Sequence, residues 1–160
     1  MLPTSQNLNN MQSSNWFAHI PGFDELTFKI KKFSIPAVTA GVTSIGNITS
    51  FVLEESGDHI TYEELTFDFL VDENLLNYRK LYKWMRENTR VGIADTTSIF
   101  IHATDNNKMF QGVELEFLEA FPIELGELEM ESDGDVPEVT CTITFKFTAF
   151  DFVDETERDQ

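Results

Sequence analysis

The stretch Ile60–Glu87, ITYEELTFDFLVDENLLNYRKLYKWMRE, decides the fold because its hydrophobic period changes once, at Asp72. Before Asp72 the apolar residues alternate with polar ones, as a strand with one buried face requires. After Asp72 the apolar residues recur at the spacing of a helix. The alternating set is Leu65, Phe67, Phe69 and Val71. A buried strand therefore leads directly into an amphipathic helix.

The start and the two faces of this helix follow from the same stretch. Asp72 is placed to cap free N–H groups, and Glu73 puts negative charge in the first turn, where the helix dipole favours it. We expect one stripe to pack on the sheet, namely Leu75, Tyr78, Tyr82 and Met85, with Leu81 and Trp84 flanking it. The opposite side carries Asn77 and the basic residues Arg79, Lys80, Lys83 and Arg86. These four basic residues are a candidate docking face for an acidic neighbour, and a plain solvated helix face is the alternative.

Length, charge and cysteine content narrow the class of protein. The 160 residues suit one domain with a real core, to which fifteen Phe contribute. The net charge of −17 argues against a nucleic-acid binder, because phosphate contacts need clustered Lys and Arg. The single cysteine, Cys141, excludes an internal disulfide and a cysteine-rich zinc site. No apolar run approaches the roughly 20 residues of a membrane span, so we expect a soluble protein in a reducing compartment, with no membrane partner.

The remaining strands give the fold class. Pro21-Gly22 predicts a turn within a hairpin over Trp16–Ile35. Two further strands are expected over 98–104 and 109–118, with Phe121-Pro122 as a break, and a clean alternation follows over Val139–Phe147. About seven strands and one helix predict a mainly β protein with one helix (α+β), an antiparallel β-sandwich or open barrel with the helix packed against it. We expect Val139–Phe147 and its partner strands to leave edge hydrogen bonds for a neighbouring subunit.

The chain divides into a flexible N-terminal arm (1–14), a β domain (15–153) and a flexible acidic tail (154–160). Within the domain, residues 38–58 fit neither period, and a loop of this length is usually functional or disordered. They predict either a β-hairpin arm that becomes ordered against a neighbour or a mobile insertion. The candidate contact residues of this arm are Val42, Ile45, Phe51, Val52 and Leu53.

A search for chemistry finds no catalytic, metal or cofactor site. The three histidines, His19, His59 and His102, fall in different elements without neighbouring ligands. Glu114 and Glu116 alternate along one strand face, which is typical of solvated carboxylates rather than of a glycosidase pair. Cys141 is in phase with core residues and is expected to be buried and inert. We therefore expect no enzyme and no cofactor.

The order of segments resembles a known family. SSNWFAHIPG, LTFKIKKFSIPAV, the long stretch quoted above, SIFIHATDNNK, GVELEFLEAFPIELGELEMES and PEVTCTITFKFTAFDFV follow one another over Ser13–Val153. This arrangement resembles the tail-tube superfamily of contractile-tailed bacteriophages. It is most similar to the tail terminators of T4-like phages, the tail completion and sheath stabiliser proteins.

The resemblance implies a structural virion protein that forms a homohexameric ring. Such a ring caps the tail tube, stops its growth, stabilises the sheath, joins the neck, and lets DNA pass without specific binding. It also implies a place in the virion tail, after synthesis in the host bacterial cytoplasm. The alternatives are the tail-tube subunit itself and a stand-alone acidic binding module.

Charge adds one expectation to the ring. From Glu114 onward there are fifteen acidic and two basic residues. Part of this excess, with Glu114 and Glu116 as leading candidates, is predicted to line the channel and repel phosphate. The alternative is that these carboxylates only keep the subunit soluble.

Overall fold

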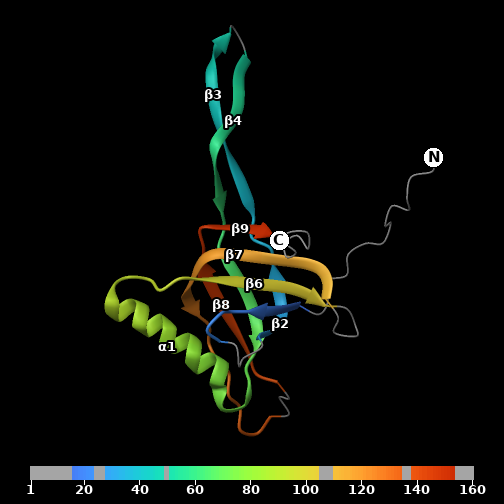
Figure 1. Cartoon of the computed structure of the whole chain (residues 1–160), viewed down its shortest axis with the longest axis vertical. Helices are drawn as coiled ribbons and strands as arrows, with labels where there is room; N and C mark the ends of the chain where they lie inside the picture. Colours follow the sequence, from blue (N-terminus) through green and yellow to red (C-terminus); the bar gives the residue numbers. More distant parts are fainter. Residues whose placement is uncertain (1–15, 24–27, 49–50, 105–109, 135–137, 154–160) are drawn as a thin grey trace, which may run out of the picture.

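The computed structural model describes residues 16–23, 28–48, 51–104, 110–134 and 138–153. The arm expected over 1–14 and the tail expected over 154–160 lie outside these residues. The described elements are nine strands, one 3₁₀ turn and one helix (Figure 1). They are β1 (Trp16–His19), β2 (Phe28–Ser34), β3 (Val38–Ile48), β4 (Phe51–Tyr62), β5 (Leu65–Leu70), η1 (Glu73–Leu75), α1 (Leu76–Val91), β6 (Thr97–Thr104), β7 (Phe110–Leu125), β8 (Thr140–Lys146) and β9 (Ala149–Phe152).

Six of the strands close into an antiparallel barrel. The order is β6-β1-β2-β5-β8-β7, and β7 pairs back onto β6, while β9 adds to β7. The fold is therefore mainly β with one helix, as predicted. Of the two expected architectures the structure has the barrel, closed rather than open, and the sandwich is not confirmed. Sequence periodicity gives the faces of each strand but not the non-local pairing between the first and last strands of a sheet.

Closure depends on a bend in β7, where the expectation of a strand break was wrong. The first part of β7 pairs with β6, and Phe121–Leu125 pair with β8. Glu119 takes a positive φ of 52° just before Ala120, the last residue paired with β6, and the register with β8 shifts between Pro122 and Glu124. A proline is tolerated at such an irregularity because no regular ladder hydrogen bond is lost. Phe121-Pro122 thus turns the strand without ending it.

Aromatic side chains fill the barrel. Phe67 of β5 stacks on Phe145 of β8 with ring centroids 5.8 Å apart, and Phe28 of β2 meets Phe69 edge-on at 5.4 Å. The alternation predicted for β5 and β8 is confirmed, because Leu65, Phe67, Phe69, Cys141, Ile143 and Phe145 are all buried. β8 lies between β5 and β7. The expectation that this strand offers edge hydrogen bonds to another subunit is therefore wrong.

The junction between β5 and α1 differs from the expected direct entry. Asn74 and Leu75 both adopt positive φ, so the helix begins only at Leu76, after the 3₁₀ turn. Asp72 still accepts a free N–H of the helix, since its Oδ1 lies 2.9 Å from the backbone nitrogen of Asn77. Asn77, which was assigned to the outer face, is buried and donates through Nδ2 to the carbonyl of Leu70 at 2.8 Å.

This anchoring sets which face of α1 packs on the barrel. Asn77 and Leu81 are buried, whereas Tyr82 is 53% exposed. Trp84, one turn beyond Leu81, lies 6.0 Å from Phe145 between ring centroids. The expected stripe is confirmed for Tyr78, which packs against the core, and wrong for Tyr82. The buried face instead runs through Asn77 and Leu81, because the Asn77 amide is held inward by its hydrogen bond to Leu70.

The strands β3 and β4 pair as a two-stranded antiparallel hairpin that projects from one end of the barrel (Figure 1). Its base is held by Tyr62, whose ring lies 5.3 Å from that of Phe150. Of the two interpretations of residues 38–58, the hairpin matches this geometry. A Cβ on Gly57 would lie 2.5 Å from the carbonyl oxygen of Gly41, so the close approach of the two strands there requires glycine.

Candidate functional site

Among the residues that the structure describes, no group of three or more His, Cys, Asp or Glu could hold a metal ion. Cys141 is buried, and burial raises the pKa of its thiol, as expected for an inert core cysteine. No helix in the part of the chain that the structure describes is long and apolar enough to cross a membrane. The candidate residues singled out in the sequence lie on the outside of the molecule, on the hairpin, on α1 and on β7.

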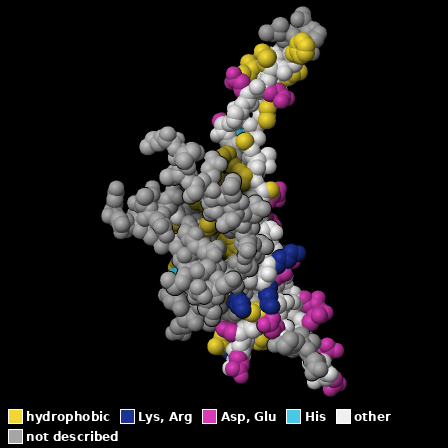
Figure 2. Space-filling view, turned by 90° about the vertical axis from the view of Figure 1, so that its right-hand side faces the viewer, with side chains coloured by type: hydrophobic (Ala, Val, Ile, Leu, Met, Phe, Trp, Pro, Cys, Tyr) yellow, Lys and Arg dark blue, Asp and Glu magenta, His cyan; other side chains and the backbone are white. Residues whose placement is uncertain are grey.

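The first surface is the outer half of the hairpin. All five residues singled out in the sequence are exposed, and Phe51 is the most exposed at 78%. The others are Val42, Ile45, Val52 and Leu53. Figure 2 shows hydrophobic and acidic side chains along this hairpin. Exposed apolar side chains concentrated on a projecting element are typical of a surface that another molecule covers.

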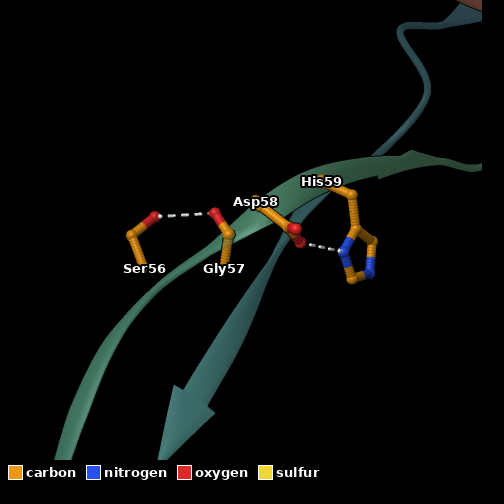
Figure 3. Close-up of polar contacts among 4 residues, drawn as sticks. All are labelled: Ser56, Gly57, Asp58 and His59. Carbon is orange, nitrogen blue, oxygen red and sulfur yellow. Dashed lines mark hydrogen bonds and ion pairs between the residues drawn. The ribbon is translucent and has the colours of Figure 1, made fainter.

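A polar segment divides this apolar half from the base of the hairpin (Figure 3). Nδ1 of His59 lies 3.1 Å from Oδ1 of Asp58, and this contact holds the pKa of Asp58 below its usual value. The Ser56 hydroxyl donates to the carbonyl of Gly57 at 3.5 Å. A Cβ on Gly41 would lie 3.1 Å from the His59 ring, which therefore covers the register shift between Ala40 and Val42. These contacts lie within β4 and beside β3, so they serve the shape of the hairpin.

The second surface is the basic face of α1. Arg79, Lys80, Lys83 and Arg86 are all exposed, as the sequence predicted. Arg90 extends the face by one turn and is bound to Glu87 at 3.0 Å. The α1 segment thus holds five of the eleven Lys and Arg residues of the chain.

Beside this face lies a groove of about 870 Å³ that the sequence did not reveal. Phe23 and Trp84 form its apolar base, with ring centroids 5.7 Å apart. Trp84 is fixed by donating from Nε1 to the carbonyl of Asp95 at 2.8 Å. Val91 and Ile93 stand at its border, 60% and 74% exposed. The groove joins residues 21–23 to residues 80–97, so no local motif marks it.

Lys80 and Lys83 line the same groove on its basic side. The Lys80 ammonium lies 5.9 Å from the centroid of the Phe23 ring, within reach of a cation–π contact. The groove therefore combines an apolar base, one cation 5.9 Å from the Phe23 ring and a second lysine in its lining, a composition suited to an apolar segment that also carries a carboxylate.

The third surface is the outer face of β7. Glu114 and Glu116 alternate with Leu115 and Phe117, which are buried, so both carboxylates lie outside the barrel and are half-buried. Glu116 is paired across the sheet with Phe100 of β6 and Asp151 of β9. Core side chains such as Phe67, Phe117 and Phe145 fill the interior of the barrel in the described part of the chain. If these carboxylates line a channel, it is one formed between subunits.

Aromatic and histidine side chains accompany these carboxylates. Phe17 of β1 stacks with His102 of β6 at 6.0 Å, and His19 lies 6.3 Å from Phe100. From the sequence, both histidines were interpreted as ordinary strand positions. In the structure each lies beside a Phe ring of the neighbouring strand.

Known proteins are similar to this chain in both sequence and architecture. The chain matches the family described as phage tail tube protein over residues 3–153. It is 24% identical over 159 residues to the tail tube terminator protein of Enterobacteria phage T4, covering 91% of this chain and 90% of that protein.

The fold also recurs in solved structures at low identity. A chain from the structure of the PVC sheath/tube terminator, an extracellular contractile injection system in its extended state, superposes with a TM-score of 0.71 at 10% identity, covering 92% of this chain and 99% of that one. A chain from the tube-terminating cap of the anti-feeding prophage gives 0.67 at 10% identity, covering 94% and 95%. At this level of identity the likeness shows the fold.

Proposed function

The chain belongs to the phage tail tube protein family, and from this premise we propose that it is the tail tube terminator of a contractile-tailed bacteriophage. One observation carries the proposal: the relation to the T4 terminator runs through 91% of this chain and 90% of that protein. The two chains therefore share the whole domain and not one motif within it. In this proposal the chain is a structural component of the virion tail, made in the host bacterial cytoplasm, without enzymatic activity or cofactor.

The active form is a homohexameric ring that caps the tube, stops its growth and stabilises the sheath. Because the barrel is closed on itself, its inner strands offer no edges, and the ring must be built from other surfaces. The hairpin β3–β4 supports this arrangement, since Val42, Ile45, Phe51, Val52 and Leu53 are exposed in the single chain. Burying such side chains against a neighbour contributes about 1.5–3 kcal/mol each, before the cost of association.

The partners follow from the position at the end of the tube. One side of the ring faces the tail-tube protein, and the other offers a surface to the sheath end and the neck proteins. The basic face Arg79, Lys80, Lys83 and Arg86 is the docking face for an acidic partner, because it is a concentrated positive surface on a chain of net charge −17.

DNA passes through the ring without specific binding. Glu114 and Glu116 line the passage, supported by their position outside the barrel on β7, next to Asp151 of β9. Carboxylates repel phosphate over about 10 Å at moderate salt, which keeps a duplex mobile.

The alternative is the tail-tube subunit itself, which the description of the matching family favours. Electron microscopy of the purified chain separates the two functions. Discrete sixfold rings support the terminator, because a terminator ring does not stack on itself. Long tubes would instead identify a tube subunit, and monomers under all conditions would refute both.

A further inference from the structure

The hairpin and the helix carry opposite charge. Residues 38–62 contain three acidic residues and no Lys or Arg, whereas α1 contains five basic residues and one acidic residue. Each element also exposes apolar side chains beside its charges, at the hairpin segment Phe51–Glu55 and in the groove next to α1. The two surfaces are therefore complementary in both charge and polarity.

The complementarity extends to the order of groups along β4. Successive side chains of a strand point to opposite faces, so Phe51, Leu53 and Glu55 share one face, and Val52 and Glu54 share the other. On the first face two apolar groups are followed, about 7 Å further along the strand, by a carboxylate. The groove places its apolar and charged groups at a matching separation, because the Lys80 ammonium lies 5.9 Å from the Phe23 ring at its apolar base.

We propose that Phe51, Leu53 and Glu55 of one copy dock into the groove beside α1 of a second copy. Phe51 and Leu53 cover Phe23 and Trp84, and Glu55 pairs with Lys80 and Lys83. The groove volume of about 870 Å³ lies within the roughly 300–1,000 Å³ of sites that enclose several apolar groups. This inference rests on the proposed function, since it assigns one of the contacts between subunits.

The contact is between copies because of where the two surfaces lie. In Figure 1 the hairpin projects away from the barrel at one end, and α1 lies along the opposite part of the molecule, so one chain cannot close the contact on itself. A contact between two different surfaces of identical chains leaves a free hairpin and a free groove at each end. Such heterologous contacts generate a ring when the rotation closes, or a helical array when it does not.

Charge reversal tests the contact in the full-length chain at about 0.15 M salt, where the Debye length of about 8 Å leaves only close pairs effective. Self-association is measured by analytical ultracentrifugation. Glu55→Lys alone and the double variant Lys80→Glu with Lys83→Glu should each weaken association about tenfold, and combining all three reversals should restore it. Unchanged circular dichroism establishes that each variant is folded.

The chain supplies matched controls. Glu54→Lys makes the same charge change one residue away on the other face of β4, and Lys29→Glu reverses an exposed charge on β2 that does not line the groove. Neither should change association more than about twofold, as for exposed charges outside a contact. Equal losses from Glu54→Lys and Glu55→Lys would overturn the assigned face.

A second measurement does not depend on charge. A Leu53→Cys chain mixed with an Ile93→Cys chain should form a mixed disulfide, whereas Val52→Cys should not, and the buried native Cys141 does not compete. Tubes capped by a chain that shows neither the disulfide nor the reversal pattern would overturn this inference and leave the proposed function standing. A chain that forms the disulfide but never caps tubes would overturn the proposed function and keep the contact.

Discussion

Asn77 gives the sharpest test of how the helix is set on the barrel. Its buried amide makes three hydrogen bonds, accepting from the backbone nitrogens of Tyr78 at 2.8 Å and Asp72 at 3.3 Å, and donating to the carbonyl of Leu70 at 2.8 Å. At about 1 kcal/mol for each bond, Asn77→Ala should lower the free energy of unfolding by about 2–3 kcal/mol.

Asn77→Asp should cost more and should depend on pH. The variant places a carboxylate oxygen against the Leu70 carbonyl and near the Asp72 carboxylate, in a site that is 1% exposed. Burial and the neighbouring carboxylate raise the pKa of the new Asp in the folded state above its unfolded value of about 3.9. Because the folded pKa is the higher one, stability is retained at low pH and lost as pH rises through it. We expect a loss above about 3 kcal/mol at pH 7 and a smaller loss near pH 4.

Denaturant titration of the dilute chain, followed by circular dichroism at both pH values, measures these changes. Asn74→Asp is the matched control, since Asn74 is exposed and its positive φ of 63° is one that Asp also tolerates. It should change stability by less than about 0.5 kcal/mol at either pH. If Asn77→Asp is as mild as Asn74→Asp, the amide does not anchor the helix as argued.

Three further predictions follow from the same structure. Leu81→Ala should cost about 2–5 kcal/mol in denaturant titration and Tyr82→Ala less than about 1, because Leu81 is buried and Tyr82 is 53% exposed; equal costs would contradict the packed face. Backbone amides of residues 38–62 should exchange hydrogen rapidly in the free chain and slowly in assembled tails, and strong protection in the free chain would contradict an arm ordered by neighbours. Replacing Glu114 and Glu116 with Lys should leave rings and complete tails intact but slow DNA ejection, and normal ejection would exclude them as channel lining.

The sequence predicted local structure well where one period dominates. The alternation through Phe67 and Phe69 and that through Ile143 and Phe145 identified two barrel strands and their buried faces. Barrel closure could not be predicted this way, because it depends on β7 bending at Glu119 to pair with two different strands. A proline within a strand is ambiguous in sequence, since it can end the strand or mark a bend.

The helix shows a second limit of pattern reasoning. Its existence and its basic face were predicted. Its buried face was predicted to include Tyr82, whereas the structure buries the preceding residue, Leu81. Two consecutive left-handed residues, Asn74 and Leu75, move the helix start, and a polar residue, Asn77, then faces inward. Hydrophobic periodicity assigns polar residues to the outside. It therefore cannot predict a buried amide such as that of Asn77, which links the end of β5 to the start of α1.

Two of the candidate surfaces could be predicted from the sequence, and the groove could not. The apolar residues of the hairpin and the basic residues of α1 were visible as composition within one segment. The groove was not, because Phe23 and Trp84 are sixty-one positions apart and meet only after the barrel has formed.

Where the chain lies in an assembled tail tests the central claim most directly. Cryo-electron microscopy of complete tails, with this domain fitted into the density, measures both its position and its copy number. The account predicts one sixfold ring at the end of the tube, in contact with the tube on one side and the neck on the other. Density for this domain repeated along the length of the tube, or absent from its end, would contradict it.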